Sequence, residues 1–159
     1  MRLKMERKET IRLAIQAEIK SQNLYKALAK SFTNPETSTL FQQLVPMEVL
    51  HEEKLRLIYA KEFPDSTLEL DENLTPDLKG IKIREAKNVL EYAISREEIA
   101  HDIYLALADD TNDAELKNLL YQFAQEELDH KTILFTEIQR LQGMMQWYDP
   151  SELNGFVED

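Results

Sequence analysis

Two short motifs in this chain combine residue types that can hold metal ions. Glu48 is followed three residues later by His51, and Glu127 is followed at the same spacing by His130. Residues three apart lie on one face of an α-helix, so each Glu and its His can point at a single metal ion. Because the second motif lies 79 residues after the first, the chain carries two matching pairs of candidate ligands.

The offset of 79 residues relates more of the sequence than these two motifs. Without a gap, the same offset also aligns Glu18 with Glu97 and Tyr25 with Tyr104. The repeat therefore superposes four carboxylates and two imidazoles. Four carboxylates and two imidazoles, related by two-fold symmetry, form the ligand set of a dinuclear metal site in a four-helix bundle. The repeat predicts such a site in this chain.

The four acidic members of this set lie within apolar stripes of helical periodicity. In a chain with 30 acids, a single Glu is usually a solvated surface residue. Glu18, Glu48, Glu97 and Glu127 are instead flanked by aliphatic residues at helical spacing, where a charge would be buried. Burying four unpaired carboxylates would cost much free energy or would force them to be protonated. Two divalent cations would cancel their four negative charges, so we predict that these residues bind metal.

Three further side chains lie near this set in the sequence. Tyr25 and Tyr104 each follow a candidate ligand by two helical turns, and each can pack in the core while its hydroxyl donates to a ligating carboxylate. His101 lies one turn beyond Glu97 but is aligned by the repeat with Gln22. Two roles stay open for His101: an additional or supporting ligand, or a hydrogen-bonded and partly exposed side chain.

Other acids near the motifs have no acidic counterpart in the repeat. They are Glu52, Glu53 and Glu126, which we expect in solvent or in contacts that support a ligand. Glu98 is about 100° around its helix from Glu97 and is expected to face solvent or a helix boundary. A ligand set of oxygen and nitrogen without sulfur fits iron or manganese, and also zinc.

The elements that must position these residues are four long helices. Only three Gly and five Pro leave little room for a turn-rich β fold. The spacing of apolar residues predicts helices over residues 5–31, 36–62, 81–109 and 114–141. Short turns join the members of each pair. Residues 63–80, which include Pro64, Pro76 and Gly80, are predicted to form a long crossover between two helical hairpins.

At 159 residues the chain suits one domain with a sizeable core. We assign residues 1–142 to an all-α four-helix bundle with a dinuclear metal site. Residues 143–159 contain Gly143, Pro150 and the single Trp, Trp147. We interpret this segment as a short C-terminal tail that packs on the bundle or on a neighbouring subunit.

Composition excludes several classes of function. The net charge of −11 argues against nonspecific binding of nucleic acid and against docking on anionic membranes. No apolar run approaches the roughly 20 residues of a membrane-spanning helix, and no apolar stretch follows the charged N-terminus as in a secretory signal. A cytoplasmic location is therefore expected. The absence of Cys excludes disulfides, thiolate metal sites and a built-in rubredoxin or iron–sulfur centre.

The paired motifs resemble those of the ferritin-like di-iron carboxylate superfamily, and most closely those of rubrerythrin-like proteins. The resemblance covers roughly residues 5–141 and rests on the pattern of a Glu followed by Glu-x-x-His, present twice. It implies the ferritin-like arrangement of two helical hairpins joined by a long crossover. It also implies a role for each ligand. Glu18 and Glu97 would be terminal ligands, Glu48 and Glu127 would bridge the two metal ions, and His51 and His130 would each bind one ion. His51 would complete the site of Glu18, and His130 the site of Glu97.

This resemblance implies two metal ions per chain, with iron favoured over manganese or zinc. No haem is expected, because Val49 stands where bacterioferritin places its haem-binding Met. The implied activity is reduction of hydrogen peroxide or O₂, with electrons from an external donor such as a rubredoxin, in a homodimer. Ala100 departs from the family pattern, because rubrerythrin has an additional Glu at this position.

Two other functions fit the same motifs. An iron storage or detoxification protein would use the same ligands, but it requires a hollow shell of many subunits. A binding module without redox activity would use the metal only to hold the bundle together. Oxidation of a substrate, such as hydroxylation, is a further alternative that would need a substrate cavity. The sequence favours the reduction of peroxide and leaves these alternatives open.

Overall fold

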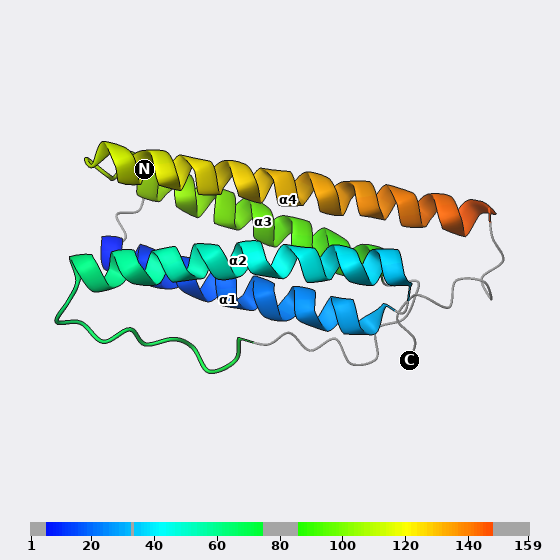
Figure 1. The fold of residues 1–159 in the computed structure, drawn as a ribbon, viewed down its shortest axis with the longest axis horizontal. Helices are drawn as coiled ribbons and strands as arrows, with labels where there is room; N and C mark the ends of the chain where they lie inside the picture. Colours follow the sequence, from blue (N-terminus) through cyan, green and yellow to red (C-terminus); the bar gives the residue numbers. More distant parts are fainter. Residues whose placement is uncertain (1–5, 33, 75–85, 148–159) are drawn as a thin grey trace.

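The computed structural model describes residues 6–32, 34–74 and 86–147 of the chain. These residues form four α-helices: α1 (Arg7–Ser31), α2 (Pro35–Glu62), α3 (Ala86–Asp109) and α4 (Ala114–Trp147). The helices run side by side along the long axis of the molecule, with α1 packed on α2 and α3 packed on α4 (Figure 1). The described residues contain no strand. The predicted all-α bundle of two helical hairpins is confirmed, in agreement with a ferritin-like fold.

Two of the helices, α2 and α4, begin where a side chain caps them. The carboxamide oxygen of Asn34 accepts hydrogen bonds from the backbone N–H groups of Glu36 and Thr37, and Pro35 occupies the first turn of α2. At the start of α4, the Asp113 carboxylate accepts from two backbone N–H groups in the same way. Most observed boundaries therefore lie close to the predicted ones. Residues 81–85, which were assigned to the third helix, lie outside the described residues.

The predicted end of the last helix is wrong. The sequence suggested that the helix stops at residue 141 and that a tail begins at Gly143, but α4 continues to Trp147. A Gly inside a helix costs only about 1 kcal/mol relative to Ala, and a helix of this length tolerates that cost. The packing proposed for the tail concerns residues 148–159, which lie outside the described part of the chain.

The first part of the crossover follows α1. Residues 63–74 leave the end of α2 and run back along the α1–α2 hairpin (Figure 1). The Gln16 side chain donates to the Asp71 carboxylate at 3.1 Å and accepts from the Asp71 backbone N–H at 2.6 Å. Asn23 donates to the backbone carbonyl of Leu74 at 3.0 Å. These bonds hold the crossover against α1 on the outside of the bundle. The remainder, including Pro76 and Gly80, lies outside the described residues.

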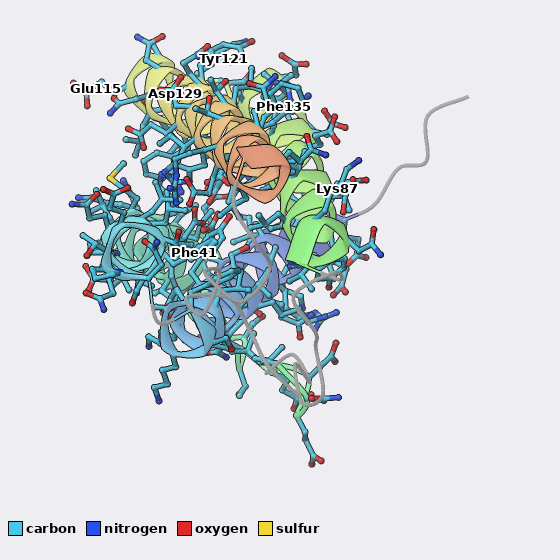
Figure 2. All side chains as sticks on the ribbon, turned by 90° about the vertical axis from the view of Figure 1, so that its right-hand side faces the viewer. Phe41, Lys87, Glu115, Tyr121, Asp129 and Phe135 are labelled. Carbon is cyan, nitrogen blue, oxygen red and sulfur yellow. The ribbon has the colours of Figure 1, made fainter. Side chains whose placement is uncertain are left out.

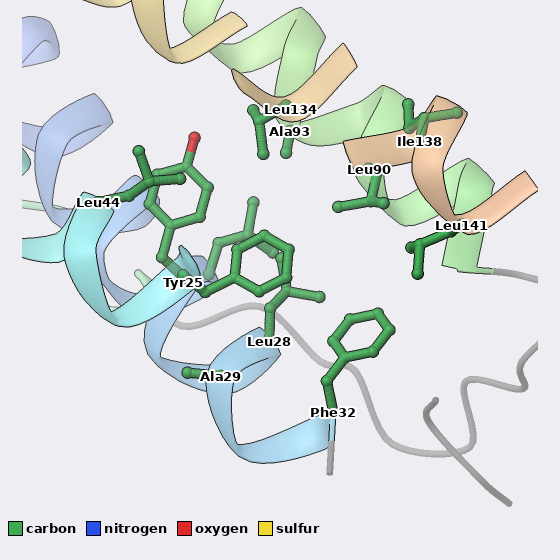
Figure 3. Close-up of a cluster of buried hydrophobic side chains, with 12 residues drawn as sticks. Tyr25, Leu28, Ala29, Phe32, Leu44, Leu90, Ala93, Leu134, Ile138 and Leu141 are labelled. Atoms are coloured by element: carbon green, nitrogen blue, oxygen red, sulfur yellow. The ribbon is translucent and has the colours of Figure 1, made fainter. Parts of the chain in front are cut away.

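The interior contains two clusters of buried apolar side chains. The first includes Leu24, Tyr25, Leu28, Phe41, Leu90 and Leu134 (Figure 3), and the second includes Ile11, Ile15, Leu55, Tyr104, Leu120 and Phe123. All four helices contribute to both clusters. In a view along the bundle axis, side chains from all four helices fill the space that they enclose (Figure 2). Each of the predicted ligands lies, along its helix, between residues of one cluster and residues of the other.

None of the helices that the structure describes contains a stretch long and apolar enough to cross a lipid bilayer.

Candidate metal centre

The six predicted ligands converge in the middle of the bundle. Glu18 comes from α1, Glu97 from α3, and one Glu–His pair from each of α2 and α4. Glu48, His51 and Glu127 are fully buried, and His130, the most exposed of the six, is only 4% exposed. Such burial of four acids contradicts the ordinary surface role of Glu.

These residues form two groups that share two members. In each group, one ligand atom per residue lies within 4.8 Å of the others; the groups are Glu18, Glu48, His51 and Glu127, and Glu48, Glu97, Glu127 and His130. The shared members are the two Glu residues that the resemblance assigns as bridging ligands. The grouping also places His51 with Glu18 and His130 with Glu97. The coordination of metal by these six residues remains a prediction.

Each histidine faces the other hairpin. Nδ1 of His51 lies 2.7 Å from Oε1 of Glu127 and 3.6 Å from a Glu18 oxygen. In the other half, Nδ1 of His130 lies 2.7 Å from Oε1 of Glu48 and 3.7 Å from a Glu97 oxygen. The two halves of the centre are thus related by the two-fold symmetry that the sequence repeat indicates.

The buried ligand atoms are not satisfied by the protein. Both carboxylate oxygens of Glu48 and of Glu127 are buried without a hydrogen-bond partner, as is Nδ1 of each histidine. Although the Nδ1–carboxylate distances are short, these atoms are not aligned as hydrogen bonds. Buried polar groups without partners cost free energy, and nearly all such groups in native proteins are paired. Divalent cations fit this set, because they would bind the unpaired oxygens and nitrogens together.

The charges in the cluster perturb one another strongly. Burial, followed by the neighbouring Glu18 carboxylate, raises the pKa of both Glu48 and Glu127 well above the usual value. For Glu97, burial acts to raise the pKa, but the neighbouring Glu127 carboxyl group and His130, together with the hydrogen bond from Tyr25, outweigh it, so the pKa is lowered. For His51, burial acts to lower the pKa, and the acidic neighbours outweigh it, so the pKa is raised. The metal-free cluster therefore retains protons that a metal ion would displace.

The two tyrosines connect the hairpins through the centre. Tyr25 of α1 donates a hydrogen bond to Oε1 of Glu97 on α3, and Tyr104 of α3 donates to Oε1 of Glu18 on α1 at 2.6 Å. Figure 3 shows the Tyr25 hydroxyl directed toward α3 and α4 from the first apolar cluster. Burial, followed by the nearby carboxylates, raises the pKa of both phenols well above the usual value. Both phenols therefore stay protonated and hold one oxygen of each carboxylate.

His101 does not join either group. Its side chain is 21% exposed, and Nδ1 lies 3.1 Å from the carboxylate of Asp102. This placement matches the hydrogen-bonded, partly exposed alternative. Glu98 lies at the surface, where it forms an ion pair with Lys131 at 3.0 Å.

Glu126 has a more specific role than sequence reasoning gave it. Its Oε2 lies 2.7 Å from Nε2 of His51, on the side of the imidazole away from the cluster. In the sequence, the only indication that Glu126 lies near the candidate site is its position next to Glu127. No spacing within one helix predicts this contact, because it joins α4 to α2.

The raised pKa values predict how the metal-free protein responds to pH. Above pH 4.5, the usual value for Glu, folded Glu48 and Glu127 retain protons that the unfolded chain has released. Stability therefore falls as pH rises, by about 1.4 kcal/mol per pH unit for each retained proton. The raised pKa of His51 likewise makes stability fall as pH rises above 6.5. The lowered pKa of Glu97 affects stability only below pH 4.5, where stability falls as pH falls.

Thermal unfolding of the chelator-treated protein between pH 5 and 9 checks this expectation. The melting temperature should decrease across the range, and it should decrease much less in the metal-loaded protein, whose ligands are already deprotonated. A constant or rising melting temperature of the metal-free protein would contradict the protonation of the buried cluster.

Comparisons with known proteins agree with the geometry. A family model described as Rubrerythrin matches residues 9–80 and 88–155, which include all six predicted ligands. Among solved structures, the chain is similar to a protein from Pyrococcus furiosus described as hypothetical, with 27% identity and a TM-score of 0.80. That similarity covers 87% of this chain and 92% of the other. No curated protein matches the chain.

Proposed function

Because the chain belongs to the rubrerythrin family, we propose that it is a di-iron oxidoreductase that reduces hydrogen peroxide with electrons from a separate donor. One observation carries the proposal: two buried groups of Glu and His share Glu48 and Glu127. Shared carboxylates can hold two metal ions close together, which suits a two-electron reaction with a small oxidant.

The six buried residues would hold the ions, Glu18 and Glu97 as terminal ligands and Glu48 and Glu127 as bridges. When bound, two ferrous ions supply the two electrons that, with two protons, reduce one hydrogen peroxide to two waters. Tyr25 and Tyr104 would keep the terminal carboxylates in place through their hydrogen bonds. The apolar clusters on both sides exclude bulk water from the centre.

Several parts of the proposal concern partners and organisation. We propose that a separate protein such as a rubredoxin supplies electrons, that O₂ is a second oxidant, and that the chain forms a homodimer. We also propose that the four-helix bundle carries the complete metal centre and that residues 148–159, which follow α4, cover the bundle or a second subunit. Light scattering of the full chain tests the dimer.

Mixing experiments with iron-loaded protein test the activity. The chain is loaded anaerobically with Fe(II), desalted, and mixed with one equivalent of hydrogen peroxide per iron pair. We expect each chain to retain two irons and a single peroxide to oxidise both. The oxidation is monitored by ultraviolet absorbance, and the residual peroxide is measured. Oxidation by peroxide should be faster than oxidation by dissolved O₂.

The controls distinguish the alternatives. Protein loaded with Zn(II) should consume no peroxide, because zinc has no accessible redox change. Uptake of tens of irons per chain in air would instead favour storage. Retention of zinc in preference to iron, together with diferrous protein that peroxide leaves unchanged, would favour a metal-stabilised binding module.

A further inference from the structure

The two halves of the candidate metal centre differ in the residues that contact the histidine, and the difference concerns a carboxylate in particular. His51 is buried on both sides of its ring: Nδ1 faces the carboxylate cluster, and Nε2 lies 2.7 Å from Oε2 of Glu126. The ring also packs on Phe123, with the ring centroids 4.3 Å apart. The imidazole of this half is therefore fixed by a carboxylate behind it and an aromatic ring beside it.

In the part of the chain that the structure describes, no carboxylate lies at the equivalent place in the second half. The sequence offset of 79 residues relates Glu126 to Met47, whose thioether is at most a weak acceptor. Nδ1 of His130 faces Glu48, just as Nδ1 of His51 faces Glu127. For the other ring nitrogen of His130, Nε2, no hydrogen-bond partner is found among the residues that the structure describes. The repeat is thus preserved in the ligands and broken in the residue that supports one of them.

From this difference we propose that the two metal positions are inequivalent, and that Glu126 makes the position of Glu18 and His51 the tighter one. A carboxylate that accepts the Nε2–H of an imidazole fixes the tautomer, so that Nδ1 presents its lone pair to the metal. The same carboxylate fixes the ring orientation and increases the basicity of the ligand. Losing such a partner typically reduces metal affinity by about 10- to 100-fold.

Glu126 is a positioning residue in this inference, because it acts through His51. The inference rests on the dinuclear site of the proposed function but not on its redox activity. Its test therefore uses Co(II), whose visible absorption reports coordination without any reaction with peroxide. Failure of the peroxide experiment would leave this test intact.

Anaerobic titration of the metal-free chain with Co(II) should give two binding steps separated by about 10- to 100-fold in affinity. Glu126→Ala should weaken the tighter step by a similar factor and leave the weaker step unchanged. Glu126→Gln, which keeps an acceptor without the charge, should have an intermediate effect. His51→Ala should remove the tighter step, and His130→Ala the weaker one.

The converse substitution tests the same inference by gain of affinity. Met47→Glu should supply a carboxylate to Nε2 of His130 and strengthen the weaker step, so that the two steps converge. Asp129→Asn, an exposed change between two ligands of α4, is the matched control and should change neither step. Melting temperatures of the metal-free variants separate a loss of folding from a loss of affinity.

Three outcomes would overturn the inference. The first is a parent chain whose two steps are equal in affinity. The second is a Glu126→Ala variant that weakens both steps equally, since that would reflect the general loss of negative charge. The third is binding of fewer than two Co(II) ions by the parent chain, which would also remove the dinuclear site.

Discussion

Replacing Glu48 and Glu127 together by Gln is expected to abolish the binding of both metal ions while making the metal-free protein more stable. Both effects follow from the position of these residues. They are the two members common to both groups, so their loss removes ligands from both metal positions. A neutral amide also binds a divalent cation far more weakly than a carboxylate.

The gain in stability has a separate cause. Glu48 and Glu127 are poorly solvated because they are buried, and they are repelled by the neighbouring Glu18 carboxylate, which is why the pKa of each is raised. Gln has nearly the shape of a protonated Glu and cannot ionise. Keeping a proton on a buried Glu at pH 8 costs free energy relative to the unfolded chain, which has released that proton, and Gln removes this cost. At pH 8 we expect a melting temperature several degrees higher, with less dependence on pH.

Metal content after dialysis and thermal unfolding of the metal-free protein measure both effects in one preparation. The matched control is Glu53→Gln combined with Asp129→Asn, which removes two exposed acids from the same two helices. The control should still bind two ions and should melt close to the parent chain. Retention of two ions by the Glu48 and Glu127 variant would refute the assignment of these residues as shared ligands.

Metal loading of the parent chain is expected to raise its melting temperature by about 10 °C or more. A ligand that binds only the folded state at 1,000 times its dissociation constant stabilises that state by about 4 kcal/mol. For a chain of this size, 1 kcal/mol corresponds to roughly 2–4 °C. Buried oxygens and nitrogens without hydrogen-bond partners destabilise the metal-free fold. A metal that binds these atoms also removes that cost.

Calorimetry with and without Fe(II), Mn(II) or Zn(II) measures this shift. Because the chain carries a net charge of −11, cations could also stabilise it by weak binding to the surface. Mg²⁺, which loses its water reluctantly, controls for that effect and should raise the melting temperature little. The variant without Glu48 and Glu127 should not respond to any of these ions. An equal response of this variant would show that the stabilising ions bind elsewhere.

The proposed centre depends on a sequence pattern that is mostly local. The spacing of Glu48 and His51 places both on one helical face, and the same holds for Glu127 and His130. Helical periodicity of apolar residues fixes which face is buried. The repeat then separates Glu97 from its neighbour Glu98, since only Glu97 has an acidic counterpart. These relations lie within single helices or follow from the symmetry of the repeat, so they need no knowledge of packing.

The contacts between hairpins could not be obtained in this way. Tyr25 donates to Glu97 and not to Glu18 of its own helix, and Glu126 of α4 supports His51 of α2. His101 lies on the same helix as Glu97, yet its side chain is 21% exposed and contacts the carboxylate of Asp102. Each of these outcomes depends on the register and rotation of one helix against another. The whole core sets that register, and no spacing within a segment encodes it.

The sequence by itself therefore determined the number and order of the helices, the hairpin topology and the six residues that converge in the core. Periodicity and an internal repeat are sufficient for these features, because they act along one chain segment at a time. The tertiary structure alone decided which carboxylate each tyrosine holds, that Glu126 contacts His51, and how far α4 continues beyond Gly143. Hydrogen bonds between hairpins require two segments to be placed in space, and a Gly in a helix stops it only when the surroundings favour another conformation.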